Sequence, residues 1–349
     1  MEALADRVQV VGASASRLAS AARLTDFVAT WSPEARPFES VRAMLDETRP
    51  DAVFNLTPAP VHADITEAAL EAGAHVYSEK PLAATLAQAD ELIATASERG
   101  LLLLCAPASA VTREVRWLRE LVVGGALGRP TLAIAQIGGM GPAAWLEYTG
   151  DPAVFYGPGV GPLRDIGIYR LHEMTSILGP VRRVQAMGAI AVPERRVEGG
   201  PLAGRTVAVS SPDHVLVQLE FANGALGQLL ASFAVPATRL PWLEIHLEAG
   251  SISLSGDAFA ADAPADVFAR PEARAGADLR VGWTIGLEPP SPPDRFPLIG
   301  EGVRHFVACL RGEEQPVLTA EHARHVLEVM TAAYDSIDTG EARRLSTTF

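Results

Sequence analysis

Short apolar segments alternate with helical repeats over the first third of the sequence, and this alternation constrains the fold more than any other feature. The expected strands cover residues 8–11, 52–56, 74–77 and 101–105, and the expected helices cover 40–47, 61–72 and 86–99. Strands that alternate with helices of about ten to fifteen residues indicate βαβ units and a parallel sheet. The first third is therefore predicted to be an α/β domain.

A different pattern begins near residue 128. Six further strands of antiparallel type are expected, at 131–137, 183–190, 214–221, 225–233, 243–247 and 251–254. Asn223 and Gly224 lie between two of them, and because both tolerate positive φ they predict a hairpin with a type I′ turn. Residues 257–297, rich in Ala, Pro and Asp, indicate an insertion or loop on one face of this sheet.

Two helices are expected near the end of the chain, at 302–310 and 320–338. The chain is thus predicted to contain a parallel α/β domain over 1–127 and an α+β domain with a large, mainly antiparallel sheet over 128–349. The C-terminal helices could pack back on the first domain.

Composition narrows the class of partner. With 349 residues, 48% of them hydrophobic, the chain can bury a sizeable core. The net charge of −13 argues against a nucleic-acid or membrane partner, because both need a basic face. Cys105 and Cys309 are too few and too far apart for a disulfide framework or a metal site. The N-terminus lacks a basic segment followed by an apolar stretch, so we expect a cytoplasmic protein.

Lys80 is the only lysine in a sequence that otherwise uses arginine, and it follows an expected strand in Ser78-Glu79-Lys80-Pro81. A single lysine in a sequence that otherwise uses arginine is expected to have a chemical role, since an ammonium can relay a proton and a guanidinium cannot. The alternative is an ordinary solvated lysine. Asn55-Leu56-Thr57-Pro58 also follows a strand, so both segments should face one crevice.

A polar stripe is expected on a later helix. Asp165, Tyr169 and His172 lie at i, i+4 and i+7, so on a regular helix they share one face. A carboxylate, a phenol and an imidazole beside a glycine-rich approach indicate the wall of a site.

These segments resemble the glucose-fructose oxidoreductase, inositol dehydrogenase and MocA family, over nearly the whole chain. The resemblance rests on Asn55-Leu56-Thr57-Pro58 with His62, on Glu79-Lys80-Pro81, and on the run from Gly159 to Tyr169. It implies a Rossmann-type domain followed by an antiparallel α+β domain, NAD(P) as cofactor, and hydride transfer at a secondary alcohol of a sugar, cyclitol or related polyol. It also implies a homodimer or homotetramer formed through the C-terminal sheet.

The resemblance also implies roles for individual residues. Lys80 would contact the nicotinamide ribose and the substrate hydroxyl, and Asp165 would bind the substrate. Tyr169 stands where the family has a histidine that relays a proton, so Tyr169 or His172 is the expected relay. The remaining cofactor candidates are Asn55, Thr57, Pro58, His62 and Glu79, and the substrate candidates are Trp145, Tyr156 and Arg164, with Arg239 as a weaker one. For Asn55, Thr57 and His62, a role in the turn and helix cap is an equal alternative.

One part of the family pattern is absent. The family begins with a strand followed by Gly-x-Gly-x-x-Gly, which binds the pyrophosphate, and this sequence has no such segment. The first βα unit is therefore predicted to be missing. Three explanations remain open: the recorded start lies downstream of the true one, the remaining strands form a rebuilt sheet, or a partner chain covers the gap. Ser14, Ser16 and Arg17 follow the first expected strand without an acidic residue, which favours NADP over NAD if a dinucleotide binds.

Three hypotheses follow. The first is an NAD(P)-dependent oxidoreductase of this family. The second is a descendant that has lost the dinucleotide and uses the same crevice for acid/base chemistry such as elimination, isomerisation or cyclisation. The third is a non-catalytic partner subunit.

Overall fold

The computed structural model describes residues 4–255, 264–271, 273, 281–288 and 298–349. The chain divides into two compact units. The first consists of Met1–Val111 with Phe296–Leu327, and the second of Thr112–Arg295 with Glu328–Phe349. Helix α5 (Arg113–Val123) thus groups with the second unit, and α7 (Leu298–Leu310) with the first.

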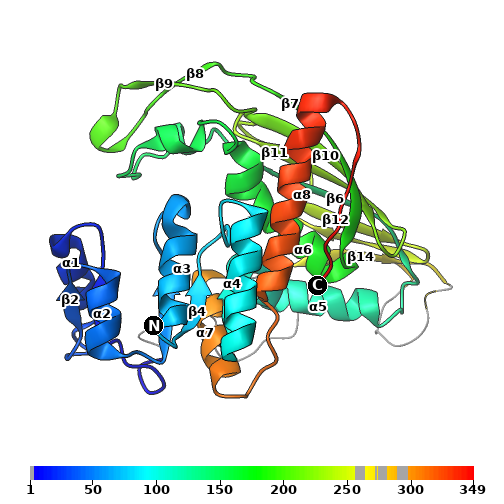
Figure 1. The fold of residues 1–349 in the computed structure, drawn as a ribbon. Coiled ribbons are helices and arrows are strands. Elements are labelled where there is room, and N and C mark those ends of the chain that lie inside the picture. Colours follow the sequence, from blue (N-terminus) through cyan, green and yellow to red (C-terminus); the bar gives the residue numbers. More distant parts are fainter. Residues whose placement is uncertain (1–3, 256–263, 272, 274–280, 289–297) are drawn as a thin grey trace. The chain divides into compact units, whose positions relative to one another are not determined.

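A parallel sheet forms the centre of the first unit. Its strands, in spatial order, are β3 (Ala52–Asn55), β4 (His75–Ser78) and β5 (Leu103–Cys105). The helices that follow the first two strands are α3 (His62–Glu71) and α4 (Leu86–Arg99) (Figure 1). Local sequence sets the limits of α4, because Thr85 and Gln88 form a capping box at its start and Gly100 adopts φ 65° at its end.

The first two strands form a separate small sheet. Strand β1 (Gly12–Ser14) pairs in parallel with β2 (Arg36–Phe38), and helices α1 (Leu18–Val28) and α2 (Val41–Thr48) accompany them. Among the described residues, neither strand is hydrogen-bonded to the β3-β4-β5 sheet. In the order 3-2-1-4-5-6 a central strand joins the two halves, and no described strand of this unit occupies that place. The sheet is not rebuilt by direct pairing of β1 with β3.

The strand predicted at 8–11 is displaced. The structure begins it at Gly12, because Val8 lies in an apolar cluster with Leu4, Val303 and Val307, and the Val10 N–H donates to the Ser32 side chain at 2.9 Å instead of to a strand. Helix α1 was not predicted from the sequence.

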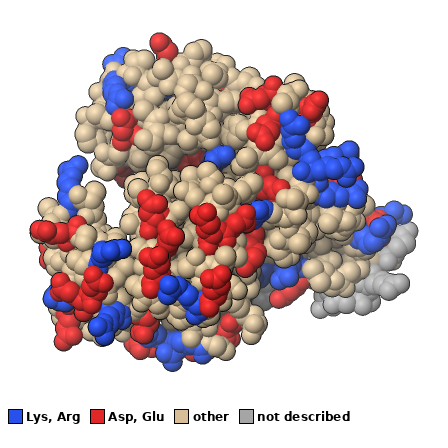
Figure 2. Space-filling view, viewed as in Figure 1, with Lys and Arg blue, Asp and Glu red and all other residues tan. Residues whose placement is uncertain are grey.

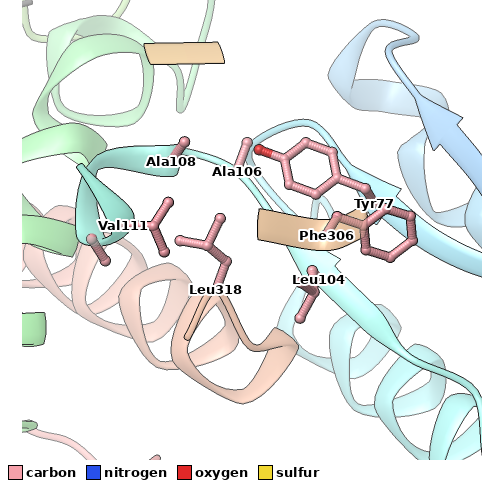
Figure 3. Close-up of a cluster of buried hydrophobic side chains, with 8 residues drawn as sticks. Tyr77, Leu104, Ala106, Ala108, Val111, Phe306 and Leu318 are labelled. Atoms are coloured by element: carbon pink, nitrogen blue, oxygen red, sulfur yellow. The ribbon is translucent and has the colours of Figure 1, made fainter. Parts of the chain in front are cut away.

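The core of the first unit joins the sheet to α7. Figure 3 shows Tyr77 and Leu104 from neighbouring strands against Phe306 of α7, with Val111 and Leu318 nearby. Phe54 completes an aromatic group, since its ring centroid lies 5.4 Å from that of Phe306 and 5.9 Å from that of Tyr77. Because α7 begins 220 residues after the end of β4, the first unit depends on a segment that returns to it late in the chain.

A nine-stranded sheet dominates the second unit (Figure 1). All neighbouring strands are antiparallel except β6 and β11, which are parallel. The spatial order is β15 (Gly282–Leu287), β14 (Ala265–Ala269), β13 (Gly250–Leu254), β12 (Leu243–Leu247), β6 (Pro130–Gly138), β11 (Leu226–Ser232), β10 (His214–Phe221), β7 (Val181–Ala189) and β16 (Arg343–Arg344). The second unit also contains helix α6 (Ile168–Leu178), the part of α8 (Ala320–Thr339) from Glu328 onward, and the hairpin of β8 (Glu194–Arg196) and β9 (Thr206–Ala208).

Two predictions for this sheet were wrong. The segment 257–297 is not only a loop, because it supplies the strands β14 and β15 at the edge of the sheet; the rest of that segment lies largely outside the described residues. The hairpin at Asn223-Gly224 is present, but its turn is not type I′. Only Gly224 has positive φ (88°), and its N–H donates to the Phe221 carbonyl at 3.0 Å, so the turn places a single left-handed glycine before β11.

A glycine loop leads into α6 through one π-helical turn, Leu163–Gly167. Gly161 has φ 62°, and a Cβ there would lie 2.6 Å from the Pro212 carbonyl oxygen. The Tyr334 hydroxyl donates to the Val160 carbonyl oxygen, and burial raises the pKa of Tyr334 to about 12, so this donor keeps its proton at neutral pH. The glycine loop therefore packs closely between α8 and Pro212, which lies just before β10.

Replacing Gly161 with alanine tests this close fit. Gly159 is a matched control, because it also has positive φ (73°) but a Cβ there would meet nothing within 4 Å. We expect Gly159→Ala to lower the free energy of unfolding by about 1 kcal/mol. Gly161→Ala should lower it by roughly a further 1–3 kcal/mol, measured by urea denaturation. Equal losses for the two variants would contradict the close packing.

Candidate functional site

The carboxyl ends of the three parallel strands lie side by side in the first unit. Asn55 pairs with Ser78 and Ser78 with Cys105, and backbone bonds continue past the strands from Glu79 N to Asn55 O (2.8 Å) and from Ala106 N to Ser78 O (2.9 Å). The two segments singled out from the sequence, Asn55 to Pro58 and Glu79 to Pro81, are therefore neighbours. Ligands of parallel sheets bind at this edge.

Asn55 fixes the turn that follows β3. Its amide nitrogen donates to the His62 carbonyl (2.9 Å) and the Thr66 hydroxyl (3.0 Å). Its amide oxygen accepts from the backbone N–H and the hydroxyl of Thr57, at 3.3 and 2.6 Å. A primary amide offers two donors and two acceptor positions, and all are used here. These contacts fit the turn-and-cap alternative, and Thr57 is half-buried beside the exposed Pro58.

His62 links that turn to the lysine segment. Its ring is buried, with Nδ1 at 2.7 Å from the Pro81 carbonyl oxygen and Nε2 at 2.6 Å from the Thr57 carbonyl oxygen. The imidazole therefore lies between the two strand-end segments, and either ring nitrogen that carries a proton donates to one of them. This places His62 in a positioning role for both segments.

Lys80 is half-buried at the end of β4, and its peptide bond to Pro81 is cis. Its backbone N–H donates to the Glu79 carboxylate at 3.1 Å, which fixes the start of the turn. The thiol of Cys105 lies behind this turn, and burial, helped by the charge of Glu79, raises the pKa of Cys105. A buried thiol in such surroundings is inert. The Glu79-Lys80 turn thus has a firm support and carries an amine.

The side chains of the first unit offer polar groups for a dinucleotide at two places. Ser14 ends β1, and the exposed Ser16 and Arg17 precede α1, where hydroxyls and a guanidinium suit a 2′-phosphate. Thr57 and Lys80 lie just past the carboxyl ends of β3 and β4. The sequence contains no Gly-x-Gly-x-x-Gly segment, which holds the pyrophosphate in such folds. The residues present therefore offer hydroxyl, guanidinium and amine groups at these two places.

In the second unit, Asp165 lies in the π-helical turn before α6. The turn has one residue more than an α-helical turn, so Asp165, Tyr169 and His172 do not follow the regular helical spacing assumed from the sequence. Asp165 and His172 are buried and Tyr169 is half-buried. Gly167 allows this arrangement, because a Cβ there would lie 3.1 Å from the Ala231 Cβ of β11.

The predicted substrate contacts have different surroundings. Tyr156 belongs to the core: it is 1% exposed, packs on Phe233, and its hydroxyl accepts the Ala143 N–H at 3.0 Å. Arg164 donates to the Thr331 hydroxyl at 3.3 Å and lies 5.8 Å from the Tyr334 ring, so it braces α8. Trp145 is 43% exposed and Arg239 is also exposed.

Sequence reasoning did not single out Tyr148 and Phe155, although both rings contact Trp145. The available signal was the gathering of four aromatic residues between 145 and 156 in a chain with 6% aromatic residues. Burial and the carboxylates of Asp165 and Asp151 raise the pKa of Tyr148, which shows that Tyr148 lies near Asp165.

Three further observations concern the surface charge, possible metal ligands and possible membrane-spanning helices. Acidic and basic side chains are interspersed over the face shown in Figure 2. Within the described ranges, no three His, Cys, Asp or Glu side chains are arranged to hold a metal ion, and every helix is too short or too polar to cross a membrane.

Comparison with known proteins gives two family matches. Residues 1–106 match the model described as "Oxidoreductase family, NAD-binding Rossmann fold", and residues 115–253 match the "GFO/IDH/MocA C-terminal domain". The chain is 33% identical over 254 residues to dTDP-3,4-didehydro-2,6-dideoxy-alpha-D-glucose 3-reductase of Streptomyces antibioticus, which covers 68% of this chain and 73% of that protein.

Two further likenesses agree. D-glucoside 3-dehydrogenase of Escherichia coli K12 is 31% identical over 231 residues, which cover 65% of this chain and 64% of that protein. The fold matches that of an NAD-binding oxidoreductase from Klebsiella pneumoniae with a TM-score of 0.79, at 20% identity over 97% of this chain and 90% of that one. The fold predicted from the sequence, a Rossmann-type parallel sheet followed by a large and mostly antiparallel sheet, is confirmed. The chain belongs to the GFO/IDH/MocA family of nicotinamide-dependent oxidoreductases.

Proposed function

We propose that this oxidoreductase interconverts a secondary alcohol and a ketone on a sugar, cyclitol or related polyol. The observation that carries the proposal is the supported Glu79-Lys80 turn at the carboxyl edge of the parallel sheet, held through His62. The names of two relatives support the substrate class, because one is a reductase and the other a dehydrogenase acting at position 3 of a sugar.

The bound nicotinamide supplies the hydride acceptor in the oxidative direction. The protein must then remove the proton of the substrate hydroxyl, because loss of hydride from a carbinol carbon leaves a protonated carbonyl. Lys80 is proposed to polarise that hydroxyl and to take its proton, because an amine, unlike a guanidinium, can relay a proton. Asp165 accepts hydrogen bonds from neighbouring hydroxyls and so orients the ring. In the second unit, Tyr169 is the proposed proton relay, with His172 as the alternative.

Lys80→Met tests this assignment. The variant should lose roughly 10²–10⁴-fold in kcat for oxidation of a polyol, because the proton has no acceptor, while its melting temperature changes little. Lys80→Arg is the matched control, since it keeps the positive charge but not the ability to relay a proton, and it should be nearly as inactive. Dehydrogenation is followed by absorbance of the reduced nicotinamide. Retention of kcat within about threefold in Lys80→Met would exclude the assignment.

NADP is proposed as the preferred cofactor. Ser14, Ser16 and Arg17 support this preference, because hydroxyls and a guanidinium can bind a 2′-phosphate and an acidic residue there would repel it. The absent glycine-rich turn supports one alternative, a descendant that performs acid/base chemistry without a dinucleotide. A cytoplasmic location remains a prediction, supported by the two free cysteines.

We also propose a homodimer or homotetramer formed through the outer face of the nine-stranded sheet. Met187 (74% exposed), Leu216 (36%) and Leu226 (54%) lie on adjacent strands of that face, with Ile134 (37%) on β6. Apolar side chains gathered on one sheet face favour a protein–protein contact. A non-catalytic partner subunit would use the same face.

The double variant Met187→Glu, Leu226→Arg should be monomeric if two copies meet through this face, because each new charge would lose its hydration in the contact. Val123→Glu is the matched control, since Val123 is equally exposed but lies on α5, away from the sheet face. Light scattering after size-exclusion chromatography gives the mass. An unchanged oligomer in the double variant, or a monomeric parent protein, would contradict the proposal.

A further inference from the structure

Three aromatic rings form a compact group in the loop that precedes α6. The ring centroids of Trp145 and Tyr148 are 5.8 Å apart, those of Trp145 and Phe155 are 5.9 Å apart, and those of Tyr148 and Phe155 are 5.8 Å apart. All three pairs meet edge to face, with interplanar angles of 62° to 79°. We call Trp145, Tyr148 and Phe155 the aromatic platform. Trp145 is 43% exposed, so the platform is open to solvent.

The β8–β9 hairpin presses directly against the backbone of the platform. A Cβ on Gly199 would lie 2.3 Å from the Leu146 carbonyl oxygen, and a Cβ on Gly200, which has φ 68°, would lie 2.1 Å from the Tyr148 carbonyl oxygen. Glycine is therefore required at both positions. The Glu198 N–H also donates to the Ala143 carbonyl at 2.8 Å. The platform, with its exposed Trp145 ring, is thus held in place before any ligand arrives, which lowers the entropic cost of binding.

Two carboxylates act on Tyr148 of the platform. Asp165 and Asp151 both act on the Tyr148 hydroxyl, and their negative charges, after burial, raise its pKa. The Arg205 guanidinium donates to the Asp151 carboxylate at 2.7 Å, so Arg205 already has an anionic partner. A phosphate or diphosphate group would meet like charges here, whereas a neutral polyol would find hydrogen-bond acceptors.

The geometry points to a binding subsite for a neutral pyranoside, in which the C–H face of the sugar ring stacks on Trp145 and the hydroxyls on its edge turn toward Asp165. Axial C–H bonds carry partial positive charge, and the face of an aromatic ring is negative, so the two surfaces attract as well as exclude water. This inference rests on the proposed function and narrows its substrate class. It separates this protein from a relative that acts on a nucleotide sugar, because dTDP-linked sugars carry a diphosphate.

Binding without turnover tests the subsite. Methyl β-D-glucopyranoside and dTDP-glucose are titrated into the full chain, and binding is measured by isothermal titration calorimetry. The expected result is saturable binding of methyl glucoside, with binding at least tenfold weaker for dTDP-glucose. Trp145→Ala should weaken methyl glucoside binding about tenfold, which corresponds to about 1.4 kcal/mol. Leu146→Ala is the matched control, because Leu146 is exposed beside Trp145 but outside the platform, and it should leave binding unchanged.

Steady-state kinetics separate this inference from the proposed function. With an active enzyme, Trp145→Ala should raise the KM for the glycoside about tenfold and leave kcat within about threefold, because the platform binds a part of the substrate away from the reacting carbon. Tighter binding of dTDP-glucose than of methyl glucoside, or an unchanged affinity in Trp145→Ala, would overturn the subsite even if the enzyme is active. If methyl glucoside binds, Trp145→Ala weakens this binding, and no polyol is turned over, the subsite is supported and the proposed function is refuted.

Discussion

The hydrogen bonds of Asn55 and His62 hold the chemically important edge of the first unit together. Asn55 uses its whole amide to fix the turn after β3, and His62 lies between that turn and the carbonyl of Pro81. Neither side chain needs to touch a ligand to matter, since together they set where Thr57 and Lys80 lie. A buried polar group is costly when it is unpaired, so loss of either partner would disturb both segments at once.

The same unit has an unusual feature at its centre. The β1–β2 sheet and the β3-β4-β5 sheet are the two halves of a parallel sheet that is usually continuous. Each half keeps its own helices, and α7 returns from late in the chain to pack on β4 and β5 through Phe306 and Tyr77. The part that carries Lys80 therefore has its own core. The small sheet that carries Ser14 has fewer buried apolar residues, because α1 buries only Ala21 and Thr25.

Much of the fold follows from sequence pattern, and the exceptions have physical causes. The βαβ periodicity and the Glu-Lys-Pro segment placed Lys80 at a strand end, because buried parallel strands and helix caps have clear local signals. Helix α1 gave no such signal, since Leu24 and Phe27 are exposed on it and a small residue, Ala21, is buried. Strands β14 and β15 were missed because β14 is short and carries Asp266, and the edge strand β15 has no fully buried residue. The aromatic platform depends on contact with a distant hairpin, so its exact grouping could not be derived from spacing alone.

Binding of a dinucleotide is the most direct test of the account, because the proposed roles of Ser14, Arg17 and Lys80 all depend on it. The melting temperature of the 349-residue protein should be measured with NAD⁺, NADH, NADP⁺ and NADPH. A ligand at about 100 times its Kd adds roughly 2.7 kcal/mol, which shifts the midpoint by several degrees. The account predicts a clear shift, larger with NADP(H) than with NAD(H). No shift with any of the four, from a protein that melts cooperatively, would contradict it and leave the cofactor-free alternative.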